Sequence, residues 1–160
     1  MADQVSGTPE SQSSTSLEAP RRPILIVEDD PVDQEMIVLA FKRAVSQCPL
    51  VTVANGKEAL QYLTAQAGRD SHLPAVIILD LNMPEMNGFE FLRRLKAQPA
   101  LAAIPVIVLT TSQFDRDLTQ SYTLGASSCL TKPGNFEQLV KLVAEIDLHW
   151  CRGGETPGAD

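Results

Sequence analysis

Polar side chains follow four apolar runs of the sequence, and their types could support metal binding and phosphate chemistry. Asp80 follows the most apolar run, residues 75–79, and opens a loop rich in Pro, Asn and Gly. The other three runs lead into Glu28 and Asp29, into Thr110, and into Lys132. If these runs are parallel strands of an α/β sheet, their carboxyl ends share one edge, where such folds bind ligands. We therefore expect a functional site at that edge.

The three carboxylates suggest a divalent cation. Glu28, Asp29 and Asp80 would each disfavour ionisation of the others, so the cluster is costly without a positive charge inside it. Mg²⁺ typically takes one or two carboxylates, waters and a phosphate oxygen. Lys132 would add a fixed positive charge and Thr110 a hydroxyl donor. A carboxylate held beside such groups can attack phosphorus as a nucleophile, while the cations neutralise the transferring oxygens.

Each of these residues also has a purely structural explanation. A lone Asp after a strand is commonly a turn residue. The acidic run 28–30 could be the N-cap and first turn of a helix, where acids favour the helix dipole, and Asp30 is best explained in that way alone. Thr110 could be an ordinary strand-end hydroxyl and Lys132 part of a plain loop. Because all four strand ends would lie on the same sheet edge, we favour a functional site.

The elements that must position these groups alternate between short apolar runs and stretches of helical periodicity, which is typical of βαβ units. Near-continuous apolar runs, as in a parallel sheet covered on both faces, predict strands at 23–28, 50–54, 75–80, 104–109 and 128–131. Five helices are expected after these strands. The third is predicted to bury Phe89, Leu92 and Leu95, and the fifth Phe136, Leu139, Val140, Val143 and Ile146. The fold class is α/β, with one doubly wound five-stranded parallel sheet and five helices.

Composition limits the classes of protein and partner. At 160 residues, 44% hydrophobic and 21% charged, the chain fits one globular domain at 22–150, with flexible segments at 1–21 and 151–160. A net charge of −7 argues against a nucleic-acid surface. No apolar run approaches the length of a membrane span and no secretory leader is evident, so we expect a cytoplasmic protein. Three cysteines without C-x-x-C spacing suggest neither a disulfide framework nor a zinc site.

The motifs at the strand ends resemble those of response-regulator receiver domains of two-component signalling, over residues 22–150. The resemblance is carried by the motifs Ile24-Leu25-Ile26-Val27-Glu28-Asp29-Asp30, Leu79-Asp80-Leu81-Asn82-Met83-Pro84, Asn87-Gly88, residues 105–110, Gly125-Ala126-Ser127 and Lys132-Pro133. It implies the flavodoxin-like strand order 2-1-3-4-5, one of the common doubly wound arrangements. It also implies a phosphoacceptor signalling protein rather than an enzyme.

The resemblance implies a role for each residue of the site. Asp80 would accept phosphate from a histidine kinase, and Thr110 and Lys132 would contact the phosphoryl group. Mg²⁺ would be surrounded by Glu28, Asp29, Asp80 and the backbone carbonyl of Asn82. Asn82 and Ser112 match the positions that tune autodephosphorylation. The Lys132–Pro133 bond is expected to be cis, which would direct Lys132 back towards Asp80.

Two features refine the resemblance. Receivers usually carry Tyr or Phe three residues before the lysine as a rotating switch, but here that position is Cys129. The chain resembles stand-alone receivers, and in particular the small regulators that partner bacterial phytochrome kinases. This implies such a kinase as the partner and a homodimer through the fifth helix, where Leu142, Leu148 and Trp150 have no predicted place against the sheet.

Three alternative functions remain open from the sequence. An aspartyl-phosphate phosphatase of the haloacid-dehalogenase type would carry its nucleophile on the first strand as Asp-x-Asp and would need a cap insertion. A flavodoxin-like FMN carrier would need a Ser/Thr/Gly loop after strand 1, where Glu28, Asp29 and Asp30 would repel phosphate. A phosphate-independent interaction module would require that Asp80 cannot be modified.

Overall fold

One parallel sheet forms the centre of the molecule. The structure is a computed structural model that describes residues 21–69, 72–83, 86–111 and 115–151. Within these residues five parallel strands are ordered β2-β1-β3-β4-β5. The strands are β1 (Ile24–Val27), β2 (Leu50–Val53), β3 (Val76–Leu79), β4 (Val106–Thr110) and β5 (Ser128–Thr131). The predicted doubly wound fold and its strand order are confirmed.

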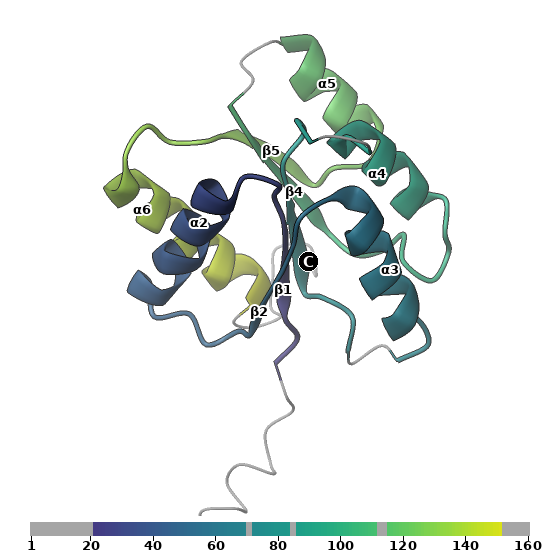
Figure 1. Ribbon diagram of the computed structural model, residues 1–160, viewed down its shortest axis with the longest axis horizontal. Coiled ribbons are helices and arrows are strands. Elements are labelled where there is room, and N and C mark those ends of the chain that lie inside the picture. Colours follow the sequence, from purple (N-terminus) through teal and green to yellow (C-terminus); the bar gives the residue numbers. More distant parts are fainter. Residues whose placement is uncertain (1–20, 70–71, 84–85, 112–114, 152–160) are drawn as a thin grey trace, which may run out of the picture.

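Helices cover both faces of this sheet. Figure 1 shows α2 and α6 on one face and α3, α4 and α5 on the other. The helices are α2 (Pro31–Arg43), α3 (Gly56–Gln66), α4 (Gly88–Lys96), α5 (Asp115–Thr123) and α6 (Phe136–Ile146), and a π-helical turn, η2 (Asp147–Cys151), continues α6. None of the helices in the described part of the chain combines the length and the apolar character needed to cross a bilayer.

Polar caps start most of these helices directly after the strands. The side chain of Asp30 accepts hydrogen bonds from the backbone N–H groups of Val32 and Asp33, so its predicted role as the N-cap of α2 is confirmed. Asn55, Asn87 and Asn135 cap α3, α4 and α6 by accepting from the N–H group three residues later. Each cap fixes the point at which a polar loop becomes a helix.

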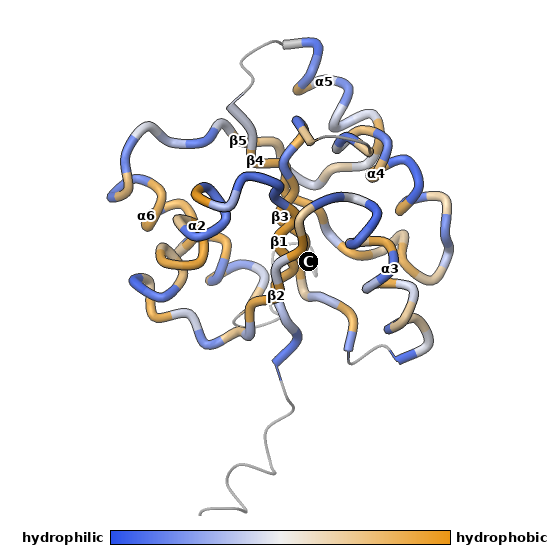
Figure 2. Tube along the Cα trace, in the orientation of Figure 1, coloured by the Kyte–Doolittle hydropathy of each residue, from blue (hydrophilic) through white to orange (hydrophobic). Residues whose placement is uncertain are grey.

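The core consists of two apolar clusters separated by the sheet. Alternate residues of β1 face opposite clusters, and all four are at most 1% exposed. Figure 2 shows this apolar band along the strands, with hydrophilic residues on the outer parts of the helices. Burial of a strand on both faces explains why its sequence is continuously apolar rather than alternating. Burying each such aliphatic side chain contributes about 1.5–3 kcal/mol.

The buried face of α4 differs from the prediction. Phe91, Leu92 and Leu95 are fully buried, whereas Phe89 is only partly buried. The rotation of α4 is fixed at its first residue, because the N–H of Gly88 donates to the backbone oxygen of Leu81 at 2.9 Å. From that point the buried residues follow an i, i+3, i+4, i+7 pattern.

The fifth predicted helix is also less buried than expected. In α6, Val143 and Ile146 are buried, while Phe136, Leu139 and Val140 are partly buried against the same cluster. The α-helix ends at Ile146, and the π-helical turn η2 takes the chain on to Cys151.

The expectation for the cysteines is wrong. Cys48 and Cys151 form a disulfide bond with a Cα–Cα distance of 6.1 Å. They are 103 residues apart in sequence and meet because the α2–β2 loop and the end of α6 lie at the same edge of the sheet. Cys151, assigned from the sequence to the flexible tail, is therefore bonded to the domain. The rest of that tail, 152–160, and residues 1–20 lie outside the described residues.

Candidate functional site

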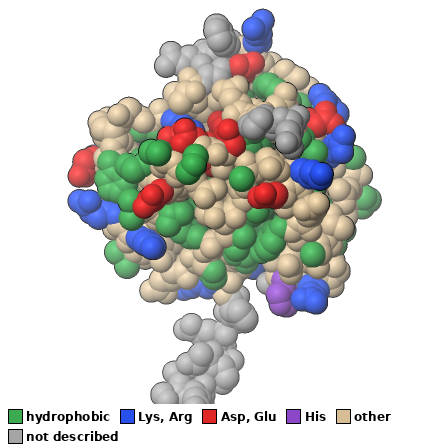
Figure 3. Space-filling model, in the orientation of Figure 1, with side chains coloured by type: hydrophobic (Ala, Val, Ile, Leu, Met, Phe, Trp, Pro, Cys, Tyr) green, Lys and Arg blue, Asp and Glu red, His purple; other side chains and the backbone are tan. Residues whose placement is uncertain are grey.

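The carboxyl ends of β1, β3, β4 and β5 bring the predicted groups together. Carboxylate oxygens of Glu28, Asp29 and Asp80 all lie within 4.8 Å of one another. Lys132 Nζ lies 2.8 Å from Glu28 Oε1 and 4.0 Å from Asp80 Oδ1. Figure 3 shows acidic side chains gathered near the upper part of the face in view. The predicted convergence of three carboxylates and one ammonium group is thus observed.

Thr110 lies at the same edge, at the end of β4. It is fully buried, and its backbone oxygen accepts a hydrogen bond from the N–H of Lys132 at 2.8 Å. This bond continues the pairing of β4 with β5 by one residue beyond Thr131. The position of Lys132 is therefore set by the sheet itself.

The predicted cis bond between Lys132 and Pro133 is wrong, because no peptide bond between described residues is cis and this one is among them. With a trans bond the long lysine side chain still extends to Glu28 and lies 14% exposed. The backbone hydrogen bond to Thr110 aligns the residue with the edge of the sheet.

Close packing of α4 holds the loop that follows Asp80. A Cβ atom at Gly88 would lie 2.7 Å from the backbone oxygen of Asp80 and 2.7 Å from Cα of Leu81. Both neighbours are backbone atoms, so neither can move aside without displacing the loop. Only glycine permits this approach, which fixes the phosphoacceptor candidate against the start of a helix.

Burial dominates the electrostatics of the two acids in the centre of the site. Glu28 is 2% exposed, and burial raises its pKa from 4.5 to about 7, although the hydrogen bond from Lys132 acts in the opposite direction. Burial also raises the pKa of Asp80, against the lowering effects of Lys132 and of the Asn82 backbone N–H. Asp29 adds to the increase at Asp80 through like-charge repulsion.

Lys132 responds in the opposite way. Burial acts to lower the pKa of its ammonium group, but the hydrogen bonds to Glu28 and Asp33 and the charges of Glu28 and Asp80 outweigh burial and raise the pKa. Lys132 is therefore held in its charged form. The site still has more carboxylates than cations.

Two residues that the sequence did not indicate belong to this network. Asp33 Oδ2 lies 3.1 Å from Lys132 Nζ, which makes it a second carboxylate partner of that ammonium group. Gln34 Nε2 donates to the backbone oxygens of Glu28 and Val53, at 3.1 and 3.2 Å, and so joins the ends of β1 and β2. The available signal was position, because both residues lie in the first turn of a helix that starts beside Glu28.

The structure describes two of the three remaining positions that the resemblance singled out, Asn82 and Cys129. The Asn82 side chain is exposed, and its backbone N–H interacts with Asp80. Ser112 lies outside the described residues. Cys129 is a partly buried free thiol, and its backbone N–H donates to the hydroxyl of Tyr122 on α5 at 3.1 Å. An aromatic side chain therefore approaches this position of β5 from a neighbouring helix.

The donor set fits a hard divalent cation. Glu28 and Asp80 are buried and Asp29 is partly buried, so all three oxygens share one restricted space. Lys132 is the cation found beside them among the described ion pairs, and Asp33 already shares it. A bound Mg²⁺ would relieve the excess negative charge, because its preferred ligands are carboxylate, carbonyl and water oxygens.

Comparison with known proteins identifies the family. A family model described as the response regulator receiver domain matches residues 24–144. The chain belongs to this family. Its members are signalling proteins, and the matched residues contain every group of the site described above. The match gives no support to a phosphatase of the haloacid-dehalogenase type or to a phosphate-independent interaction module.

Individual relatives agree with this assignment. The probable methanogenesis regulatory protein FilR2 of Methanothrix harundinacea is 39% identical over 84% of this chain and 87% of its own length. Response regulator Rcp1 of Synechocystis sp. is 36% identical over 88% of this chain and 96% of its own. The chain thus spans most of the length of both relatives.

Solved structures give the same result. The Mn²⁺-bound form of Rcp1 superimposes with a TM-score of 0.73 at 34% identity, covering 86% of this chain and 99% of that one. The phosphorylated cyanobacterial phytochrome response regulator RcpA gives 0.72 at 37% identity, covering 82% and 94%. The predicted likeness to phytochrome-associated regulators is confirmed.

Proposed function

We propose that the protein is a cytoplasmic, single-domain response regulator that accepts a phosphoryl group on Asp80 from a histidine kinase in a Mg²⁺-dependent reaction. The observation that carries the proposal is the convergence of Glu28, Asp29, Asp80 and Lys132 at the carboxyl edge of the sheet. Phosphorylation would then change the contacts that the protein makes with its partners. A relative solved in a phosphorylated form, RcpA, supports this proposal.

The chemistry follows from the residues of the site. A carboxylate oxygen of Asp80 forms a bond to phosphorus as the bond from phosphorus to the donor histidine nitrogen breaks. Lys132 lies 4.0 Å from Asp80, so a small shift from Glu28 would bring its ammonium group to a phosphoryl oxygen. Thr110 would offer its hydroxyl from the end of β4. These groups stabilise charge that develops on the transferring oxygens.

Glu28, Asp29, Asp80 and the backbone carbonyl of Asn82 would hold the metal ion. When bound, Mg²⁺ would neutralise the carboxylates and the oxygens of the incoming phosphoryl group. The Mn²⁺-bound structure of Rcp1 supports a divalent cation at this kind of site. Before the ion binds, two effects reduce the repulsion between the buried acids. Lys132 supplies a positive charge, and the raised pKa of Glu28 keeps part of its carboxyl groups neutral near pH 7.

Intact-mass spectrometry tests the phosphoacceptor. Incubation with acetyl phosphate and Mg²⁺ should increase the mass by one phosphoryl group, and Asp80→Asn should abolish the increase. Asp30→Asn is the matched control, because Asp30 lies at the same edge but caps α2 with its side chain. Asp30→Asn should therefore still be modified. A phosphoryl group mapped to a Ser, Thr or His residue would contradict the proposal.

The kinase partner is proposed to be a bacterial phytochrome. The support is the likeness to RcpA, a cyanobacterial phytochrome response regulator. Phosphotransfer from a panel of autophosphorylated histidine kinases tests the choice. We expect the fastest labelling of Asp80 from a phytochrome kinase, and faster labelling from an unrelated sensor kinase would reject this partner while leaving the receiver function intact.

A homodimer through α6 is a further part of the proposal. Leu148 is 58% exposed, and a groove of about 420 Å³ between β5 and α6 is lined in part by Leu130, Pro133 and Leu142. Trp150 contributes less than the sequence suggested, because it packs partly against the core and is only partly exposed. The apolar surface thus lies along α6 and the edge strand β5.

Light scattering tests the dimer. The wild-type protein should give twice the 17.4 kDa mass of one chain. Leu148→Glu and Leu142→Glu should both give folded monomers, whereas Lys57→Glu, at an exposed lysine of α3 on the other face of the sheet, should remain dimeric. A wild-type chain that stays monomeric at high micromolar concentration, with or without phosphorylation, would remove this part of the proposal.

A further inference from the structure

The Cys48–Cys151 bond joins two segments at the amino edge of the sheet, opposite the phosphoacceptor site. Cys48 lies in the loop between α2 and β2, and Cys151 is the last residue of η2. Their Cα atoms are 6.1 Å apart, inside the range of natural disulfides. The bond encloses β2 to β5 and α3 to α6 in one covalent loop. It therefore constrains most of the domain.

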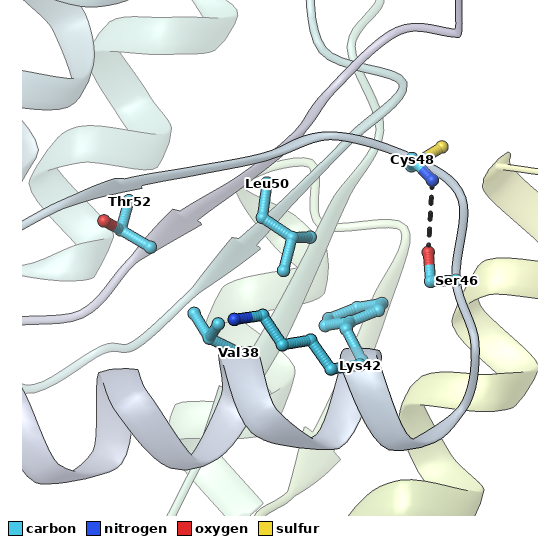
Figure 4. A pocket seen from close by; sticks show the side chains of 7 residues that line it. Val38, Lys42, Ser46, Cys48, Leu50 and Thr52 are labelled. Carbon is cyan, nitrogen blue, oxygen red and sulfur yellow. Dashed lines mark hydrogen bonds between the residues drawn. The ribbon is translucent and has the colours of Figure 1, made fainter.

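Small thiols can reach this bond. Cys151 is partly exposed. Cys48 is only 6% exposed and lies at one end of a pocket of about 490 Å³ between α2 and β2. Figure 4 shows Cys48 beside Ser46, with its sulfur pointing away from Leu50 and Lys42, so we expect an external thiol to approach the bond at Cys151. Accessible disulfides exchange with external thiols, whereas buried ones do not.

Weaker contacts join the same two segments. Ser46 Oγ donates to Asp147 Oδ1 at 2.7 Å and accepts from the backbone N–H of Cys48 at 3.3 Å. A third segment also contacts η2, because Arg21 Nη1, just before β1, donates to the backbone oxygen of Cys151 at 3.5 Å. These hydrogen bonds would remain after reduction of the disulfide. Breaking the covalent bond should therefore loosen the segments without unfolding the domain.

Both segments have backbones that need support. Val45, in the α2–β2 loop, has a φ angle of 60°, which is unusual and strained for a β-branched residue. η2 is a π-helix, a conformation that is rare and usually occurs as a single turn held by its surroundings. η2 also carries Trp150, which packs partly against the core, and the exposed Leu148. Removal of the cross-link should free this turn.

We infer that Cys48 and Cys151 form a redox-responsive latch that exchanges with a low-molecular-weight thiol–disulfide couple and sets the position of η2. The inference rests on the proposed function in one respect, that the protein works in the cytoplasm, where protein disulfides are usually transient. On oxidation, two cysteine thiols and one glutathione disulfide give the Cys48–Cys151 bond and two glutathione thiols. Two electrons and two protons pass from the protein to glutathione, and reduction is the reverse.

Thiol counting tests the exchange. The full chain is equilibrated with mixtures of reduced and oxidised glutathione, denatured, and alkylated at its free thiols. Intact-mass spectrometry then gives the number of alkylated cysteines. Oxidising mixtures should leave one alkylated cysteine, Cys129, and reducing mixtures should give three. The number of alkylated cysteines should change from one to three at a glutathione ratio that lies between these mixtures. A pair that stays reduced in oxidised glutathione, or stays bonded in every mixture, would overturn the inference.

Thermal melts and the single tryptophan test the effect on η2. Cys151→Ser should lower the Tm by about 10 °C relative to the oxidised wild type and move Trp150 emission to longer wavelength, as should reduction of the wild type. Cys129→Ser is the matched control and should do neither. Equal Tm and emission in Cys151→Ser and the oxidised wild type would show that no latch exists.

Asp80→Asn separates this inference from the proposed function. That variant should lose phosphorylation and keep the whole redox response, because the two sites lie at opposite edges of the sheet. Loss of the redox response in Asp80→Asn would contradict an independent latch. Failure of phosphotransfer in a chain that still exchanges its disulfide would count against the phosphoacceptor alone.

Discussion

At the carboxyl edge of the sheet, Glu28, Asp80 and Lys132 form a largely buried group of charges, whereas at the amino edge a disulfide and the Ser46–Asp147 hydrogen bond join the segments. The first arrangement destabilises the fold, because burial raises the pKa of both acids and more carboxylates than cations are present. The second constrains the unfolded chain and so stabilises the fold. From this comparison we infer that the chemistry requires unfavourable electrostatics at the carboxyl edge, and that the disulfide at the amino edge offsets part of this loss of stability.

Removal of the lysine should have the largest effect at the charged edge. Lys132→Met leaves Glu28 and Asp80 buried without their cation, which should lower the free energy of unfolding by about 3–5 kcal/mol near neutral pH. Chemical denaturation without Mg²⁺ measures the change. Lys57→Met, at an exposed lysine of α3, is the control and should change stability by less than about 0.5 kcal/mol. Equal effects of the two variants would mean that Lys132 does not balance the buried acids.

Stability without metal should depend on pH through Glu28. Its folded pKa of about 7 exceeds its ordinary value of 4.5, so between these values the folded state binds more protons than the unfolded state. The free energy of unfolding should therefore fall as the pH rises from about 4.5 to 7, by up to about 3 kcal/mol, and the raised pKa of Asp80 acts in the same direction.

Denaturation in EDTA at a series of pH values measures this slope. Glu28→Gln should flatten it, because glutamine does not titrate, and saturating Mg²⁺ should weaken it by favouring the charged carboxylates. A metal-free wild type that becomes more stable between pH 4.5 and 7 would show that the acids are not strained by burial.

The close contact at α4 should have an intermediate effect. Gly88→Ala puts a methyl group 2.7 Å from backbone atoms of the Asp80 loop, which should cost about 2 kcal/mol and slow phosphorylation by acetyl phosphate. Gly134→Ala is the matched control, since its Cβ would meet nothing within 4 Å. Comparison of both variants by denaturation and by intact mass tests whether the loop is held by this contact. Normal phosphorylation in Gly88→Ala would show that it is not.

The smallest effect is expected from Asp29. Asp29→Ala removes one of three clustered carboxylates, so the metal-free protein should gain about 0.5 kcal/mol of stability while losing its stabilisation by Mg²⁺. Thermal melts with and without Mg²⁺ measure both changes. Glu35→Ala, at an exposed acid of α2, should alter neither. Full Mg²⁺-dependent stabilisation in Asp29→Ala would exclude Asp29 as a ligand.

The sequence alone determined the architecture and the main groups of the site. Strands such as β1 and β3 are buried on both faces, so a continuous apolar run in the sequence predicts them as strands. In a parallel sheet the residue after such a run must lie at the carboxyl edge, so Asp80 and Lys132 could be placed without coordinates. Asp30 could be recognised as a cap because capping depends only on its near neighbours.

Tertiary structure decided everything that depends on rotation and on distance between remote segments. The buried face of α4 was set by the contact of Gly88 with the Asp80 loop, which selected Phe91 in place of Phe89. Asp33 joined Lys132 across 99 residues, and Cys48 joined Cys151 across 103. No local pattern records such pairs, because they form only when the sheet has brought the ends of β1, α2, β5 and α6 together.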